Sequence, residues 1–211
     1  MSDTTPKELI ILNDNHKKII DEWFSMLQQR RGKFNGITYN GRKLRAELRR
    51  NSLSELIFLQ DGYNILANKL INNDSKLAKT EVHDYALQIF VNVAAFVESN
   101  SDKIPFAAQL SEKINGGERN YLSELRFERL LASENPDEFC QRLIRAVKLR
   151  GKKGVNLTSL ADGIFLWMQE WNAREHGWSA DTNPFKRLSV RWAMDYFLTK
   201  NNTNTNTNTK E

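Results

Sequence analysis

Apolar residues recur every three to four positions along most of the chain, which is the pattern of amphipathic helices. The first such segment predicts a helix over residues 14–30, with Ile20 and Trp23 on its apolar face. A loop is expected over residues 32–41, followed by a short basic helix over residues 42–50. No part of the chain shows a convincing two-residue alternation of apolar and polar positions, so no strand is expected.

Helix-start signals locate several later elements. Ser52 and Glu55 have the spacing of a capping box, so a helix is expected to begin there and to continue to Leu70. Asn followed by Pro at 135–136 and at 183–184 combines an N-cap with proline at the first helical position. The remaining expected helices cover residues 80–97, 106–114, 119–132, 135–151, 157–169 and the segment that follows 183.

The polar segment 99–105 is the best candidate for a boundary between two halves of the chain. It divides a helical half at residues 1–100, which contains the basic helix 42–50, from a second helical half at residues 101–199. Residues 200–211 are rich in Asn and Thr and poor in apolar side chains, which predicts a disordered tail. The expected fold is therefore all-α, with about eight or nine helices in two packed helical halves and a disordered polar C-terminal tail.

Composition narrows the class of protein. The 211 residues are 40% hydrophobic and 27% charged, and no stretch approaches the roughly 20 apolar residues of a membrane span. The first eight residues contain no apolar core of a secretory signal. The single cysteine, Cys140, excludes an internal disulfide framework. These features predict a cytoplasmic protein with no membrane partner.

The sequence offers little catalytic chemistry. The three histidines lie far apart, and none has a partner at metal-ligand spacing. Neither a phosphate-binding loop nor a dinucleotide-binding glycine motif occurs. Cys140 lies among apolar residues of an expected helix, which favours a buried structural thiol over a nucleophile. We therefore expect no catalytic residue, no metal and no cofactor, and a protein that is not an enzyme.

Positive charge is concentrated rather than spread evenly. Lysine and arginine number 31 against 26 acidic residues, so the net charge is a modest +5. Residues 30–50, however, carry eight cations against the single acid Glu47. The eight are Arg30, Arg31, Lys33, Arg42, Lys43, Arg45, Arg49 and Arg50.

Helical geometry would gather part of this charge on one side of the basic helix. Arg42, Arg45 and Arg49 are separated by three and four residues and share a face, while Leu44 and Leu48 can anchor the other side. A charge run is ordinarily a solvated helix face, but such an excess of cations favours binding of backbone phosphates. The candidate binding residues here are Arg42, Lys43, Arg45, Arg49 and Arg50.

A second group of cations lies on the two helices expected at 119–132 and 135–151, at intervals of three residues. Acidic residues on the same helices can pair with them, and cations are favoured near a helix C-terminus in any case. Phosphate binding and ordinary surface pairing are therefore equal alternatives. The members of this group are Arg126 and Arg129 on the first helix and Arg142, Arg145 and Lys148 on the second.

Three segments resemble the motifs of a known family. Residues 41–50 are similar to its Gly-x-Arg-Ala-x-Leu-Arg-Arg segment, at Arg45, Ala46, Leu48, Arg49 and Arg50. Residues 126–133 resemble its Arg-Phe-x-Arg-Leu-Leu-Ala-Ser motif, and residues 191–197 its closing Arg-Trp-Ala-x-Asp-Tyr helix. Together they cover residues 41–198 in order and resemble CasB, the small subunit of the type I-E CRISPR Cascade complex.

The resemblance implies a non-enzymatic, all-helical subunit, present as a pair of copies in a ribonucleoprotein with guide RNA and other Cascade subunits. It also implies binding of single-stranded and duplex DNA, with the displaced strand held so that the R-loop is stabilised. Residues 171–181 and the Asn/Thr tail depart from the family pattern. The alternatives are a helical scaffold whose basic faces dock acidic partner surfaces and, ranked lower, a stand-alone sequence-specific DNA-binding protein.

Overall fold

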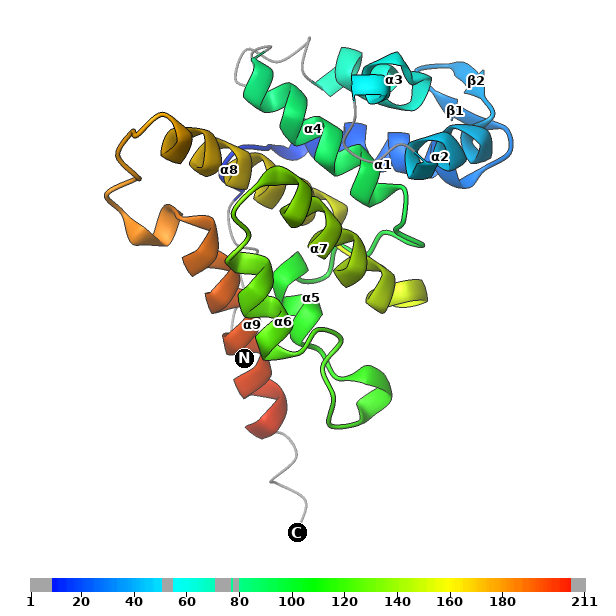
Figure 1. The fold of residues 1–211 in the computed structure, drawn as a ribbon. Helices are drawn as coiled ribbons and strands as arrows, with labels where there is room; N and C mark the ends of the chain where they lie inside the picture. The colour runs from blue at the N-terminus through cyan, green and yellow to red at the C-terminus, as the bar shows by residue number, and fades with distance from the viewer. Residues whose placement is uncertain (1–8, 51–54, 71–76, 78–79, 206–211) are drawn as a thin grey trace.

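The computed structural model describes residues 9–50, 55–70, 77 and 80–205. The regular elements of this part of the chain are helices apart from one short hairpin, which confirms the all-α prediction (Figure 1). The α-helices are α1 (Asp14–Gln28), α2 (Gly41–Arg50), α3 (Asp61–Leu70), α4 (Glu81–Ala94), α5 (Phe106–Ser111), α6 (Glu124–Leu131), α7 (Pro136–Arg150), α8 (Leu157–Glu175) and α9 (Leu188–Thr205). The strands are β1 (Gly32–Phe34) and β2 (Ile37–Tyr39), and 3₁₀ turns cover Glu55–Leu59, Ile114–Gly116, Gly151–Lys153 and Pro184–Lys186.

The centre of the core is formed by α4 and α8, which pack against each other. Every residue from 86 to 95 in and after α4, and every residue from 160 to 168 in α8, is buried. Helices that are apolar on all sides belong in the interior of a larger assembly of helices. Around this pair, α7 packs on α4, and α1 packs on α8 (Figure 1). The division into two helical halves, at residues 1–100 and 101–199, stays a prediction.

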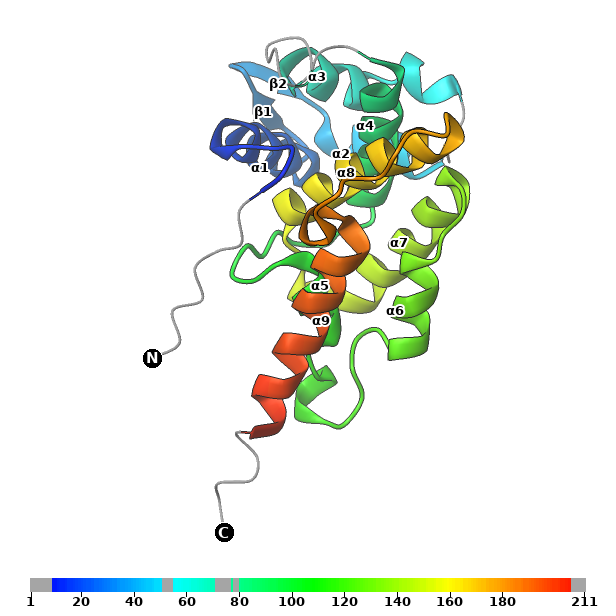
Figure 2. The same cartoon turned by 90° about the vertical axis from the view of Figure 1, so that its left-hand side faces the viewer.

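The last helix, α9, packs against α5, and Figure 2 shows the two side by side. A Cβ on Gly163 of α8 would lie 2.4 Å from the Trp192 ring, so α8 and α9 approach closely only because glycine is there. Tyr196 stacks on Phe127 of α6 with ring centroids 4.1 Å apart, and its hydroxyl donates to the Leu122 carbonyl at 2.6 Å. The motif segments 126–133 and 191–197, which are far apart in the sequence, therefore contact each other in the fold.

One of the two helix starts predicted from an Asn-Pro pair is confirmed. The Asn135 side chain accepts from the Glu138 amide at the start of α7, with Pro136 at the first position, as expected. The second Asn-Pro pair differs in outcome. Asn183 caps only the 3₁₀ turn Pro184–Lys186, and α9 begins after it at Leu188.

The loop predicted over residues 32–41 is wrong, because β1 and β2 form an antiparallel hairpin there. Asn35 and Gly36 form its two-residue turn with φ values of 50° and 78°, the left-handed conformations that such turns require. Each strand has three residues, so the alternation is too short to recognise in the sequence.

Several helix boundaries also differ from those predicted. The helix expected from Ser52 to Leu70 is broken into the turn Glu55–Leu59 and α3, and Ser52 itself lies outside the described residues. The helix expected at 119–132 begins at Glu124, because the Arg119 carbonyl instead accepts from the Ile114 amide at 2.8 Å. At the C-terminal side α8 extends to Glu175, and α9 continues into the Asn/Thr segment as far as Thr205.

Candidate nucleic-acid interface

The basic helix α2 is anchored on one side and charged on the other, as predicted. Leu44 and Leu48 are buried, and the Asn92 side chain of α4 donates to the Leu48 carbonyl at 3.0 Å. The Asn40 side chain accepts from the Lys43 amide at 3.2 Å and thereby caps the start of the helix. This anchoring fixes which face of α2 carries its arginines.

Arg45 is the least available of these arginines. Its guanidinium donates to the Ala95 carbonyl at 2.8 Å, to the Val97 carbonyl and to the Gln28 side chain. The two carbonyls lie just after α4, where a helix leaves carbonyl groups without internal partners and attracts positive charge. Burial lowers the pKa of Arg45, and neighbouring Arg49 lowers it further. Arg45 therefore joins α2 to the end of α4.

Arg42 and Arg49 flank Arg45 and are exposed. Arg49 uses its Nε to donate to the Ala95 carbonyl at 2.7 Å, and no hydrogen bond of the described residues occupies its terminal nitrogens. Within the part of the chain that the structure describes, neither side chain forms an ion pair. Their terminal guanidinium groups can therefore bind an anion.

A pocket of about 500 Å³ lies along this face of α2. Three guanidinium groups contribute to its lining, together with a side-chain amide of α1. The Nε2 atom of Gln28 is buried there without a hydrogen-bond partner among the described residues. A concave surface with convergent N–H donors suits a phosphate group. The lining residues are Gln28, Arg42, Arg45, Ala46 and Arg49.

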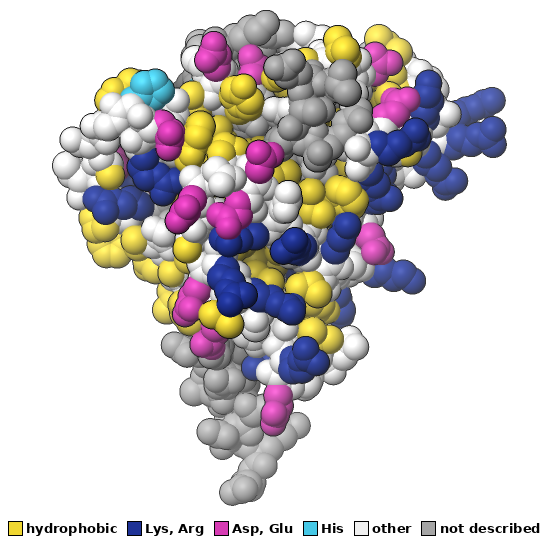
Figure 3. All heavy atoms as spheres, viewed as in Figure 1, with side chains coloured by type: hydrophobic (Ala, Val, Ile, Leu, Met, Phe, Trp, Pro, Cys, Tyr) yellow, Lys and Arg dark blue, Asp and Glu magenta, His cyan; other side chains and the backbone are white. Residues whose placement is uncertain are grey.

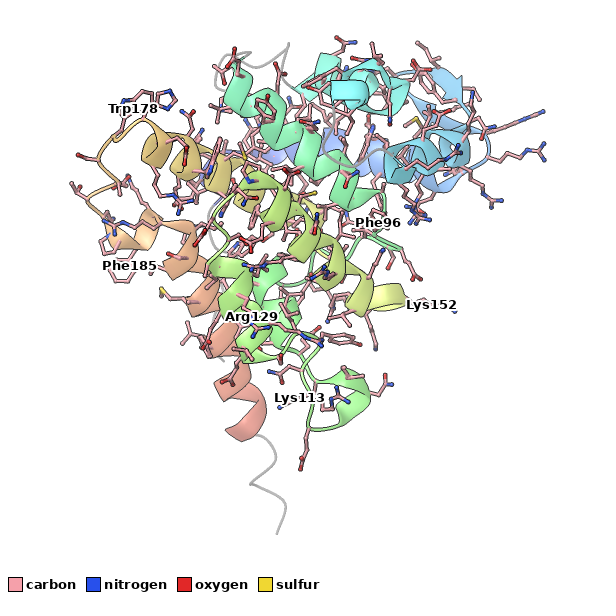
Figure 4. All side chains as sticks on the ribbon, viewed as in Figure 1. Phe96, Lys113, Arg129, Lys152, Trp178 and Phe185 are labelled. Atoms are coloured by element: carbon pink, nitrogen blue, oxygen red, sulfur yellow. The ribbon has the colours of Figure 1, made fainter. Side chains whose placement is uncertain are left out.

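Phe96 brings the two predicted groups of cations together. The Arg49 guanidinium of α2 lies 5.5 Å from the centroid of its ring, and the Lys148 ammonium of α7 lies 4.2 Å from it. Figure 4 shows Phe96 between α2 and the C-terminal half of α7. Arg145, three residues before Lys148, is exposed. Sequence reasoning missed Phe96, and no local signal identifies it, because Phe96 and Lys148 meet only in the folded chain.

The remaining members of the second group do not behave alike. Arg126 and Arg129 are exposed on α6, and Figure 4 labels Arg129 on that surface. Arg142 instead turns toward α6, where it donates to the Arg129 carbonyl and pairs with Glu138. Arg142 therefore fixes α7 against α6, as Arg45 fixes α2 against α4.

Together the exposed cations form a basic surface on one side of the molecule. Figure 3 shows Lys and Arg side chains over α2 and the hairpin and again over α7 and α6, with hydrophobic side chains between them. We call this the basic face. It consists of Arg42, Lys43, Arg49, Arg50, Arg126, Arg129, Arg145 and Lys148, with Lys43 also 3.7 Å from Glu47.

Arg150, at the end of α7, is a buried arginine whose contacts are all within the fold. It is only 4% exposed, and it donates to the Gly154 carbonyl at 3.0 Å and the Gln109 carbonyl at 2.8 Å. It also forms an ion pair with Glu112 at 2.5 Å, and its guanidinium lies 4.4 Å from the centroid of the Tyr121 ring. This side chain is part of the core and contributes nothing to the basic face.

Other kinds of chemistry find little support in the described residues. No group of three or more His, Cys, Asp or Glu side chains among them could hold a metal ion. Cys140 is buried, and burial raises the pKa of its thiol to about 12, which keeps the thiol protonated at neutral pH. None of the described helices has the length and hydrophobicity to cross a membrane.

Comparison with known proteins identifies a family. No curated protein and no solved structure matches the chain. The family described as CRISPR-associated protein Cse2 matches residues 44–197, which begin in α2 and end in α9. This family, also known as CasB, provides the small subunit of the type I-E Cascade complex. Because the match covers more than half of the chain, the protein belongs to the Cse2 family of CRISPR Cascade subunits.

Proposed function

We propose that this protein is a non-catalytic, nucleic-acid-binding small subunit of a cytoplasmic Cascade ribonucleoprotein. Its basic face contacts DNA or RNA backbone and stabilises the R-loop by holding the displaced strand. The observation that carries the proposal is the convergence of Arg49 and Lys148 at Phe96, which joins the cations of α2 to those of α7. The joined surface suits an extended polyanion better than either helix alone.

The exposed groups of the basic face favour contacts that do not depend on base sequence. Guanidinium and ammonium groups bind phosphate oxygens, and such contacts position a strand without reading its bases. In a guided complex, base pairing with the RNA reads the sequence, so sequence-independent contacts from the protein are sufficient. The proposed partners are single-stranded and duplex DNA, the guide-RNA ribonucleoprotein, other Cascade subunits and a second copy of this chain.

The experiment is a titration of labelled single-stranded and duplex DNA across a salt series with purified protein. We expect Arg42→Gln/Arg49→Gln to weaken binding and to reduce the slope of log K against log salt by up to about 1.4 for single strands, at about 0.7 per phosphate. Arg45 is left unchanged in this variant because its loss would disturb α4.

The matched control is Lys103→Gln/Lys186→Gln, which removes two exposed cations outside the basic face. Its affinity and slope should equal those of the wild type. Equal binding by wild type and Arg42→Gln/Arg49→Gln would contradict the proposal and favour a scaffold whose basic face docks acidic protein surfaces.

A further inference from the structure

The β1–β2 hairpin lies outside the residues that match the family and carries a concentration of charge of its own. Arg30 and Arg31 precede β1, and Lys33 is its central residue. All three are exposed, as are Asn35 and Gly36 at the turn. The hairpin was not expected from the sequence, so the position of these cations is known only from the structure.

The base of the hairpin is held firmly against the end of α1. A Cβ on Gly32 would lie 2.2 Å from the Met26 carbonyl oxygen, and one on Gly41 would lie 1.8 Å from the same atom. Phe34 is buried on the same side of β1 as Gly32. Strand alternation then turns Lys33 to the opposite, exposed side, where it pairs across the strands with exposed Thr38.

The hairpin is also joined to the start of α2. The Arg42 amide donates to the Gln29 carbonyl at 3.2 Å, so the residues that follow α1 lie next to the first turn of α2. Gln28 and Arg42 both line the pocket of the basic face. Figure 3 shows Lys and Arg side chains extending outward from this end of the molecule. The cations of the hairpin therefore continue the basic face beyond α2.

The cations of the hairpin lack an acidic partner at ion-pair distance in the described part of the chain. Arg30, Arg31 and Lys33 form no ion pair with any described residue. Like charges held close together on a firmly anchored element repel one another, and a polyanion relieves that repulsion when it binds. Because the hairpin is fixed at its base, little further ordering is needed on binding.

We propose that the hairpin is a second contact for nucleic-acid phosphates, in which Arg30, Arg31 and Lys33 extend the site along the same strand or duplex that α2 binds. The inference rests on the proposed function, since it requires the basic face to bind nucleic acid. It adds an element that lies outside the family match, and it predicts that this chain binds a longer stretch of backbone than the matched residues alone would.

The test is Arg30→Gln/Arg31→Gln/Lys33→Gln in the full chain, titrated with single-stranded DNA, duplex DNA and an RNA strand of the same sequence over a salt series. Because this variant lacks three cations that each bind a phosphate, the slope for single-stranded DNA should fall by about 2. Affinity at low salt should fall at least tenfold, and the difference from wild type should shrink as salt rises. If affinity falls more for single-stranded DNA, duplex DNA or RNA than for the other two, that nucleic acid is the one whose phosphates the hairpin binds.

The control is Lys18→Gln/Lys103→Gln/Lys186→Gln, which removes the same charge from exposed positions elsewhere. An equal loss of slope in this control would overturn the inference, since net charge alone would then explain the effect. Unchanged binding by the hairpin variant, with weakened binding by Arg42→Gln/Arg49→Gln, would overturn the hairpin contact and leave the proposed function standing. Failure of the wild type itself to bind would overturn both. An unchanged midpoint of thermal unfolding shows that each variant is folded.

Discussion

The helices α2 and α7 are both rich in arginine, but the arginines of α2 are exposed apart from Arg45, whereas two of the three arginines of α7 are held by contacts within the fold. On α2, Arg42 is exposed and Arg49 keeps its terminal nitrogens free of described partners. On α7, Arg142 is hydrogen-bonded to α6, and Arg150 is buried in an ion pair. The spacing of cations in the sequence determines which side of a helix each one occupies. The carbonyl and carboxylate groups of neighbouring elements determine whether that cation is available to a ligand.

The ends of neighbouring helices account for much of the difference. A helix leaves its last carbonyl groups without internal partners, and long cationic side chains can satisfy them. Arg45 does so after α4 through the Ala95 and Val97 carbonyls, and Arg142 does so at the end of α6 through the Arg129 carbonyl. An arginine within reach of such carbonyls stabilises the fold, whereas one facing solvent can bind phosphate.

The largest expected effect is on stability, at Arg150. Arg150→Met removes the charge and the side-chain donor to the Gly154 and Gln109 carbonyls, and it also removes the ion pair with Glu112. We expect a loss of about 3 kcal/mol in the free energy of unfolding. For a chain of this length that corresponds to a fall of about 6–12 °C in Tm. Urea and thermal unfolding followed by circular dichroism measure it.

The control for that prediction is Arg145→Met, on the same helix but exposed. Its free energy of unfolding should change by no more than about 0.5 kcal/mol. A loss as small as this in Arg150→Met as well would show that Arg150 is not used structurally and would remove the contrast between α7 and α2.

The next largest effect distinguishes Arg45 from Arg42, which lies three residues before it on α2. Arg45→Ala leaves the Val97 carbonyl without its side-chain donor and the Ala95 carbonyl with Arg49 alone, so we expect a loss of about 1–2 kcal/mol in the free energy of unfolding. Arg42→Ala, in the same helix, should change stability by less than about 0.5 kcal/mol and weaken binding of DNA instead. Unfolding and DNA titrations of both variants test the distinction. A stable Arg45→Ala that no longer binds DNA would reverse it.

Local patterns in the sequence predicted much of the fold. The three-to-four spacing located most helices, Leu44 and Leu48 were placed on the anchored side of α2, and Asn135 was identified as a cap. The hairpin was missed even though Asn35-Gly36 is a strong turn signal, because three-residue strands are too short to show alternation.

The use of each arginine could not be predicted in the same way. Arg150 depends on Glu112, 38 residues away, and on the face of Tyr121. Arg45 depends on carbonyls about 50 residues away, which every residue type possesses and no sequence pattern marks. Sequence therefore predicts where positive charge lies, and only the packing of the helices shows which cations remain accessible.

The smallest expected effect concerns Phe96, where the contrasted helices meet. Phe96→Leu keeps an apolar side chain but removes the ring that lies against Arg49 and Lys148. Each exposed cation–π contact contributes about 0.5–1 kcal/mol, so we expect affinity for single-stranded DNA to fall about two- to fivefold as the two cations lose their orientation. All charges remain, so the dependence of binding on salt should keep its wild-type slope. Lys148→Gln should instead reduce the slope by about 0.7. Wild-type affinity in Phe96→Leu would mean that α2 and α7 act as separate sites, whereas the expected loss at constant slope would show that the ring aligns them on one strand.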